Sequence, residues 1–143
     1  MAKEKVFIYG TLKRGHANHH YVWGRIGYLG RCRTRTPYPL VVGGKWFSPF
    51  LLEEPGQGHC VTGDLFEADE DGMEMMDRLE GVGRPKGYLR DRIVVEMLDG
   101  GEEVEAWAYL KDRSCIQGEC SDPIPEYLED DRYVPPADRP TGF

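Results

Sequence analysis

The sequence lacks the features that mark several protein classes. No apolar run approaches the roughly 20 residues of a membrane-spanning helix, and Met1–Lys5 leads into the first expected strand without the apolar stretch of a signal peptide. No CxxC pair occurs among the cysteines, which predicts free thiols and leaves a disulfide between Cys115 and Cys120 as the less favoured alternative. We therefore expect a cytoplasmic protein with no membrane partner.

Acidic residues are nearly absent from the first third of the chain. Residues 1–52 hold nine Lys/Arg and one acid, Glu4, whereas the remainder holds nine Lys/Arg and 24 Asp/Glu. Such a basic segment favours an anionic group such as a carboxylate or phosphate, and less strongly a nucleic acid. Three of these basic residues lie in one predicted strand, where side chains alternate between its two faces. We expect Arg31, Arg33 and Arg35 to point outward into solvent and Cys32, Thr34 and Thr36 to point the other way.

Repeats, linkers and a second domain are also missing, so residues 1–143 predict one domain. Apolar and β-branched runs predict strands over residues 6–9, 25–36, 38–42, 60–67, 88–98 and 104–110, with a hairpin turn at Asp99–Gly101. Gly63 suggests a bulge or a close backbone contact in its strand. The tail from about residue 121 is rich in proline and irregular. It lies along the rest of the domain, caps a site, or is disordered.

The stretch around Tyr9-Gly10-Thr11-Leu12 is the first candidate site. Val6, Phe7 and Ile8 predict a buried strand that ends in this loop. A glycine directly after a strand allows a tight turn and close approach to a ligand, while backbone N–H groups and a hydroxyl supply donors. The pattern suits an anion, although most such turns are only turns.

A helix over residues 69–80 carries the second candidate. Its acidic start suits the positive end of the helix dipole, and Met73, Met76 and Leu79 form an apolar stripe. Glu80 lies four residues after Met76, on the apolar side and in the last turn, where the dipole disfavours a negative charge. Such an acid is either frayed into solvent or held for chemistry, and spacing alone leaves both open.

Three histidines after the first loop invite a metal hypothesis. His16, His19 and His20 would share one face of a short helix over residues 16–23. No HExxH pattern or cysteine pair accompanies them, so we favour a structural role in which hydrogen bonds fix the loop.

Taken together, several motifs resemble those of the γ-glutamylcyclotransferase-like (AIG2-like) family, most closely its γ-glutamylamine cyclotransferase branch. They occur in the family's order over about residues 5–110: Tyr9 to Gly15 with Asn18-His19, Tyr38-Pro39-Leu40-Val41, Gly63-x-Leu65-Phe66, the helix ending in Glu80, and Tyr88-x-Arg90-x-x-Ile93-Val94. The resemblance implies an α+β fold, a small mixed β-barrel with a helix packed across it.

The resemblance also implies an enzyme that cleaves the C–N bond of a γ-glutamyl amide by cyclisation, without metal or cofactor. The products are 5-oxoproline and a free amine. Glu80 matches the catalytic acid/base. The expected substrate-binding residues are Tyr9, Gly10, Thr11 and Leu12, together with Tyr38, Pro39, Leu40 and Tyr88; the last either orients Glu80, lines the pocket or packs in the core.

Other interpretations stay open. The leaving amine could be an alkylamine, the ε-amine of lysine, an amino acid, cysteinylglycine from glutathione or a natural-product amine, and the walls that would select it are expected at Trp46, Phe47 and Phe50. A small-molecule-binding module without catalysis is the alternative from another class. An unpaired acid on an apolar face, such as Glu80, argues against it. Nucleic-acid binding, which would weaken steeply with salt, is the least favoured.

Overall fold

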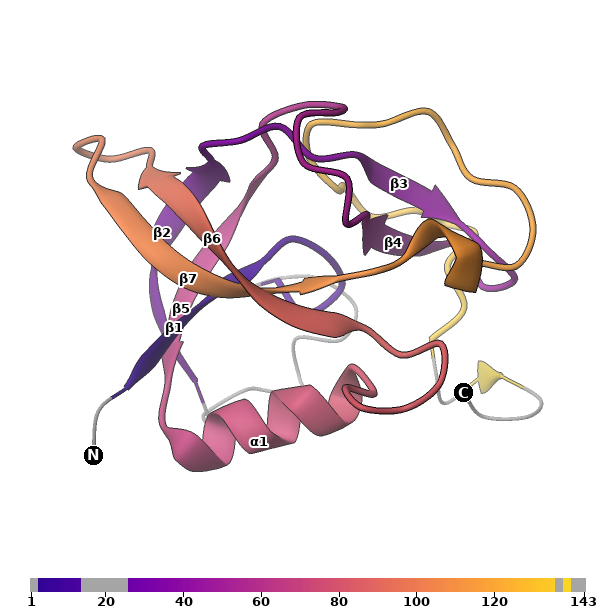
Figure 1. The fold of residues 1–143 in the computed structure, drawn as a ribbon, viewed down its shortest axis with the longest axis horizontal. Helices are drawn as coiled ribbons and strands as arrows, with labels where there is room; N and C mark the ends of the chain where they lie inside the picture. The colour runs from indigo at the N-terminus through magenta and orange to yellow at the C-terminus, as the bar shows by residue number, and fades with distance from the viewer. Residues whose placement is uncertain (1–2, 14–25, 136–137, 140–143) are drawn as a thin grey trace.

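The computed structural model describes residues 3–13, 26–135 and 138–139. Within these ranges, five strands form a closed barrel in the order β1-β5-β2-β6-β7, which closes where β1 and β7 run parallel (Figure 1). The strands are β1 (Glu4–Ile8), β2 (Ile26–Thr34), β5 (Thr62–Ala68), β6 (Leu89–Met97) and β7 (Glu103–Leu110). The expected α+β fold with a small mixed barrel is confirmed.

Alternating side chains fill the barrel. In β2, Cys32 and Thr34 are buried while Arg31 and Arg33 are exposed, as the sequence predicts. Thr36 is exposed, against the prediction, because β2 ends at Thr34 and the chain bends there. The strand alternation therefore holds only as far as the β2 ladder extends.

A glycine lets β1 and β5 approach closely. A Cβ added at Gly63 would lie 2.5 Å from the Ile8 carbonyl oxygen, so this position makes the close backbone contact expected of it. The irregular register of the barrel lies elsewhere, between Tyr28 and Gly30 of β2.

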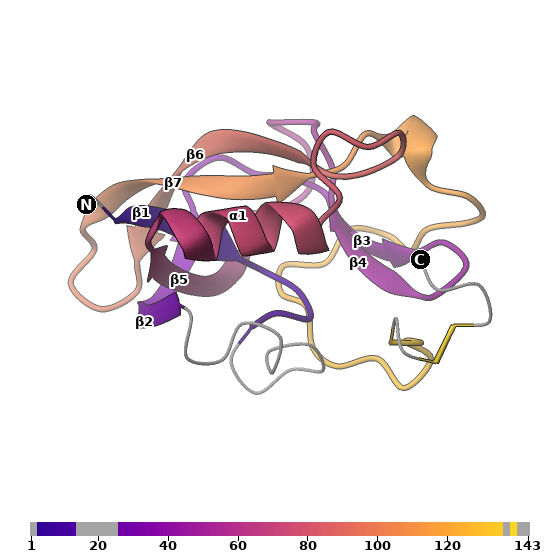
Figure 2. The same cartoon turned by 90° about the horizontal axis from the view of Figure 1, so that it is seen from below.

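Helix α1 (Glu70–Leu79) lies across one face of the barrel (Figure 2). It begins at the N-cap Asp69, whose carboxylate accepts a hydrogen bond from the Gly72 N–H at 2.8 Å. Met73 and Met76 are buried against Phe66 of β5 in a second apolar cluster. The predicted stripe thus fixes which side of the helix faces the barrel, and with it the direction of the residue that ends the helix.

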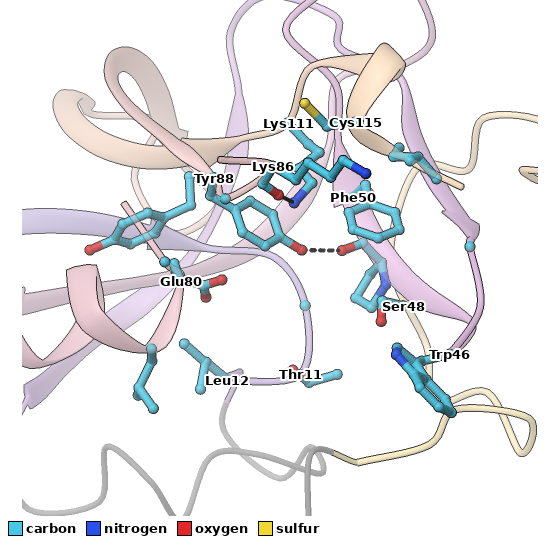
Figure 3. A pocket seen from close by; sticks show the side chains of 18 of the residues that line it. Thr11, Leu12, Trp46, Ser48, Phe50, Glu80, Lys86, Tyr88, Lys111 and Cys115 are labelled. Carbon is cyan, nitrogen blue, oxygen red and sulfur yellow. Dashed lines mark hydrogen bonds between the residues drawn. The ribbon is translucent and has the colours of Figure 1, made fainter. Parts of the chain in front are cut away.

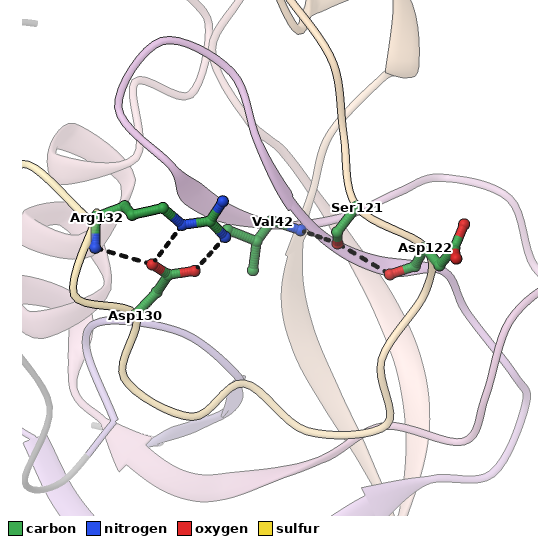
Figure 4. A network of polar contacts seen from close by, with 5 residues as sticks. All are labelled: Val42, Ser121, Asp122, Asp130 and Arg132. Carbon is green, nitrogen blue, oxygen red and sulfur yellow. Dashed lines mark hydrogen bonds and ion pairs between the residues drawn. The ribbon is translucent and has the colours of Figure 1, made fainter.

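The remaining strands form a hairpin, β3 (Leu40–Gly43) and β4 (Ser48–Leu51), beside the barrel (Figure 1). The proline-rich tail lies along it: the Val42 N–H donates to Ser121 Oγ at 2.9 Å (Figure 4), and the side chain of Tyr127 is buried. The Val134 N–H donates to the Trp46 carbonyl at 3.1 Å. The described part of the tail is therefore packed against the hairpin and the barrel.

Candidate active site

A cavity of about 910 Å³ opens between the end of β1, the β3–β4 hairpin, the last turn of α1 and the tail. Six of the predicted site residues line it: Tyr9, Gly10, Thr11, Leu12, Glu80 and Tyr88. They come from three separate segments of the chain. Figure 3 shows the Glu80 carboxylate directed into this space, with Thr11 and Leu12 along one side and Tyr88 along another.

Backbone hydrogen bonding and a following glycine fix Glu80 at the C-terminal end of α1. Its N–H donates to the Met76 carbonyl at 2.9 Å, and Gly81 follows with φ of 66°, which ends the helix. The side chain is partly exposed, because it faces the cavity rather than the packed core. The C-terminal end of α1 thereby presents one carboxylate to the cavity.

The surroundings of Glu80 favour its protonated form. Burial among protein atoms raises its pKa to about 7, and the Lys111 ammonium opposes this shift. Among the described residues, no cation lies within ion-pairing distance of its carboxylate and no hydrogen bond to it is formed. A carboxyl group with such a pKa can both accept and donate a proton near neutral pH.

Tyr88 connects the end of the helix to the hairpin. Its N–H donates to the Glu80 carbonyl at 3.0 Å, its hydroxyl donates to the Pro49 carbonyl at 3.2 Å, and its ring stacks on Phe50 with centroids 6.0 Å apart. The loop before it turns back sharply, since a Cβ at Gly87 would lie 1.9 Å from the Gly81 carbonyl oxygen. Tyr88 thus forms a wall of the cavity, and its hydroxyl points to the hairpin.

The first loop is held in place by contacts on both sides. The Tyr9 hydroxyl donates to the Tyr109 carbonyl at 2.7 Å, and burial, reinforced by the charge of Glu80, raises the pKa of this phenol well above its usual value. A Cβ at Gly10 would lie 2.8 Å from Pro49 Cγ, so the loop packs directly against β4. Glycine at this position brings the loop and the hairpin to the same cavity.

The structure does not bring the other three predicted contacts to the cavity. Leu40 is fully buried, and Tyr38 lies in the same apolar cluster. The Pro39 carbonyl accepts the Leu52 N–H at 2.9 Å, and Tyr38 pairs with His59. With these backbone pairings, Tyr38 and Leu40 lie in the apolar core rather than at the cavity.

Sequence reasoning missed several residues of the cavity. Lys111, one position after β7, places its ammonium 4.6 Å from the ring centroid of Tyr88 and donates to the Lys86 carbonyl. Tyr133 and Arg139 of the tail also line the cavity. No spacing pattern in the sequence marks these three residues.

Of the three residues predicted as walls, Trp46 and Phe50 line the cavity, whereas Phe47 packs against the core.

The metal hypothesis falls on His16, His19 and His20, which lie outside the described residues together with the predicted helix over 16–23. In the described ranges, no group of three or more His, Cys, Asp or Glu side chains is arranged to hold a metal ion. All four cysteines, each within those ranges, have free thiols. None of the helices described there combines the length and apolarity needed to cross a bilayer.

Comparisons with known proteins agree on one family. The family model described as gamma-glutamyl cyclotransferase, AIG2-like, matches residues 6–130. The chain is 38% identical to the gamma-glutamylaminecyclotransferase of Mus musculus over 114 residues, 73% of this chain and 75% of the relative. It is 38% identical to the Homo sapiens protein of that name over 109 residues, 71% of this chain and 70% of the relative.

A solved structure extends the likeness to the fold. An AIG2-like protein from Mus musculus superposes with a TM-score of 0.84 at 31% identity, covering 97% of this chain and all of the other. The chain belongs to the gamma-glutamyl cyclotransferase, AIG2-like family.

Proposed function

We propose that the protein is a γ-glutamylamine cyclotransferase, which converts a γ-glutamyl amide into 5-oxoproline and a free amine. The names of its relatives support this activity. The observation that carries the proposal is Glu80, the single carboxylate among the described residues that line the cavity, with its pKa raised to about 7.

The reaction needs one proton shuttle and one nucleophile that the substrate itself supplies. Glu80 takes a proton from the α-ammonium of the γ-glutamyl group, and the freed amine attacks the γ-carbonyl carbon. The new C–N bond closes a five-membered ring. The bond to the leaving nitrogen breaks as Glu80 returns the proton to that nitrogen, and the freed carboxylate then relays the second proton of the ring nitrogen to the departing amine, which leaves as an ammonium. Two protons thus move from the α-nitrogen to the leaving nitrogen, and atoms and charge balance without a cofactor or an external nucleophile.

The protein's second contribution is to fold the substrate for this attack. An intramolecular reaction gains mainly from holding the reacting atoms in a near-attack geometry. The loop Tyr9 to Leu12 faces the Glu80 end of the cavity (Figure 3), and we assign it the α-carboxylate and the oxyanion that develops on the γ-carbonyl oxygen. Tyr88 restricts the other side of the glutamyl group.

The test is a panel of γ-glutamyl amides, assayed by mass spectrometry for 5-oxoproline. It contains an alkylamide, γ-glutamyl-ε-lysine, a γ-glutamyl amino acid and glutathione, each incubated with the wild-type protein and with Glu80→Gln. We expect release from at least one compound and its loss in the variant. If every compound stays intact although some bind, the protein is a small-molecule-binding module on the same fold.

Two further statements belong to this proposal. We place the protein in the cytoplasm, which the free thiols support, and we treat residues 1–143 as one domain, which the packing of Tyr127 supports. Its partner is a small γ-glutamyl molecule, and no nucleic acid or membrane takes part.

A further inference from the structure

One side chain of α1, Asp77, ties the helix to the barrel face that it crosses (Figure 2). Its Oδ1 accepts a hydrogen bond from the Tyr109 hydroxyl at 2.8 Å, and its Oδ2 lies 3.0 Å from Nη1 of Arg90. Tyr109 belongs to β7 and Arg90 to β6, so one carboxylate joins the helix to two strands. Among the described residues, the other side chains of α1 form no hydrogen bond or ion pair with the barrel.

The position of Asp77 in the helix relates this tie to Glu80. The two residues are three apart, so their side chains are neighbours at the same end of α1. The end of a helix is its least restrained part, because its last carbonyls have no partner within the helix. A contact that fixes the last turn to the barrel therefore also fixes the direction in which Glu80 leaves it.

Tyr109 connects the same tie to the first loop. Its backbone carbonyl accepts the hydrogen bond from the Tyr9 hydroxyl at 2.7 Å, while its own hydroxyl donates to Asp77. Tyr109 is buried and lines the cavity, whereas Asp77 does not line it. One buried tyrosine thus lies between the loop that we assign to the substrate and the helix end that carries Glu80.

The two contacts of Asp77 differ in strength. The side chains of Arg90 and Asp77 are 29% and 26% exposed, so water weakens their ion pair, although the Arg90 guanidinium carbon also lies 4.6 Å from the ring centroid of Trp107. The Tyr109 hydroxyl is buried, and a buried donor without an acceptor is costly. The hydrogen bond from Tyr109 is therefore the contact that holds the helix end most firmly.

We propose that Asp77 is a positioning residue, which holds the Tyr109 hydroxyl and thereby fixes the end of α1 with the Glu80 carboxylate directed into the cavity (Figure 3). Asp77 acts through the helix and not on the substrate. Its effect on the reaction rests on the proposed function, whereas its effect on the direction of Glu80 does not. The two effects are measured separately.

The first experiment follows the direction of Glu80 without substrate. The side-chain carboxyl ¹³C resonance of Glu80, identified by its absence from Glu80→Gln, is titrated in the wild-type chain, Asp77→Ala and Asp77→Asn. In the wild type we expect a pKa of about 7. In Asp77→Ala the released carboxylate reaches solvent, so its pKa should fall toward the reference value of 4.5. Asp77→Asn keeps an acceptor for Tyr109 and should titrate close to the wild type.

The pair of Asp77 variants separates the hydrogen bond from the charge. Both remove one negative charge from the same place, so a direct electrostatic effect on Glu80 would move both titrations equally. Tyr109→Phe removes the hydroxyl without changing a charge, and its titration should move as in Asp77→Ala. The Asp77 variants leave in place the ionisable groups that interact with Glu80 from the surrounding elements: Tyr9, Tyr88, Tyr109 and Lys111.

The second experiment measures 5-oxoproline release from the γ-glutamyl amide that the wild-type chain cleaves fastest. Asp77→Ala should lower kcat about ten- to a hundredfold and change KM less than about threefold, because it displaces the acid/base and leaves the substrate contacts intact. Asp77→Asn should restore most of the lost kcat. Tyr109→Phe should resemble Asp77→Ala, and the double variant should be no worse than the more impaired single variant.

Met73→Ala is the control for a general loss of packing. Met73 is buried under the same helix, one turn before Asp77, and makes no polar contact with the barrel. This variant should lower the midpoint of urea unfolding at least as much as Asp77→Ala does, but it should lower kcat less and leave the Glu80 titration in place.

Several results would overturn the proposal. They are an unchanged Glu80 titration in Asp77→Ala, equal shifts in Asp77→Ala and Asp77→Asn, or a loss of kcat in Met73→Ala as large as in Asp77→Ala. Tyr109→Phe takes the place of Asp77→Ala if that variant does not fold. If the wild-type chain releases no 5-oxoproline from any amide, the proposed function fails, and the titration alone decides whether Asp77 directs Glu80.

Discussion

The fold treats two of the ionisable side chains in its described ranges, Lys13 and Glu80, in opposite ways. Lys13, only 2% exposed, donates to the Tyr127 carbonyl at 2.7 Å and lies 3.7 Å from the Glu126 carboxylate. Arg31 completes the group, with its Nη2 2.6 Å from Glu126. Glu80, at the C-terminal end of α1, has none of these partners within the described ranges.

The pairing of Lys13 explains what it does. Burial lowers its pKa, and Glu126 opposes that shift, so the ammonium is retained as a structural link between the β1 loop and the tail. Burial instead raises the pKa of Glu80 to about 7, and the Lys111 ammonium acts against this shift. The paired charge thus links two segments of the fold, whereas the unpaired one faces a cavity, where we propose that it transfers a proton.

The comparison is tested most strongly by removing the unpaired charge. Glu80→Gln keeps the shape but cannot accept a proton, so kcat/KM for 5-oxoproline release should fall about a thousandfold. The matched control is Glu74→Gln, an exposed acid on the same helix, which should keep wild-type activity. A Glu80 variant with more than about a tenth of the wild-type rate would remove this residue from the mechanism.

Removing the paired charge should act on stability. Lys13→Met removes the hydrogen bond from Lys13 to the Tyr127 carbonyl, while Glu126 keeps Arg31, so the free energy of unfolding should fall by about 2–3 kcal/mol. Lys3→Met, which breaks an exposed pair with Glu67 at 3.4 Å, should cost less than about 1 kcal/mol. Urea titration measures both. Similar losses in the two variants would mean that the cluster around Lys13 has no special role.

Local patterns were enough to predict the elements on which this contrast depends. The spacing of Met73 and Met76 and the glycine after Glu80 predicted the helix, its buried side and its end, which the structure places at Leu79. The strand alternation predicted the inward side of β2 up to Thr34. Both depend on neighbours within a few positions in the chain.

The rest of the cavity depends on contacts between distant segments. Lys111 reaches it because β7 lies beside β1, and Arg139 because the tail follows the hairpin, neither of which leaves a local spacing signal. The family motif predicts Tyr38, Pro39 and Leu40 as substrate contacts. The pairing of Tyr38 with His59 and of Pro39 with Leu52 places them in the core instead.

The burial of Glu80 should reduce the free energy of unfolding by an amount that depends on pH. The pKa of this carboxyl group is about 7 in the folded chain, and 4.5 is the reference value for the unfolded chain. Between these two pH values the folded chain binds a proton that the unfolded chain has lost. Stability therefore decreases as pH rises through that window. At about pH 8, Glu80→Gln should be more stable than wild type by about 1–3 kcal/mol, a range reduced for the open cavity.

Thermal or urea unfolding of both proteins at about pH 5 and about pH 8 measures this effect. The advantage of the Gln variant should be largely lost at the lower pH, where wild-type Glu80 is protonated in the folded state. Glu74→Gln, at a position 69% exposed, should show no such dependence. A gain for Glu80→Gln that is the same at both values would assign it to packing rather than to charge.

The smallest expected effect concerns the one cation that acts on Glu80. The Lys111 ammonium lowers the pKa of this carboxyl group against the effect of burial, so Lys111→Gln should raise it. On the acidic limb of the pH profile of kcat/KM, Glu80 becomes the free base. This limb should move to higher pH in the variant, so that activity at the pH values of the wild-type limb falls a few-fold. Lys86→Gln is the matched control, because it also lines the cavity but has no such influence on Glu80, and its backbone carbonyl still accepts from Lys111.

The position of the limb separates the two roles that Lys111 can have. A lower plateau with an unmoved limb would mean that Lys111 only contacts substrate, and Glu80 would then be unpaired in the stricter sense that no cation modulates it.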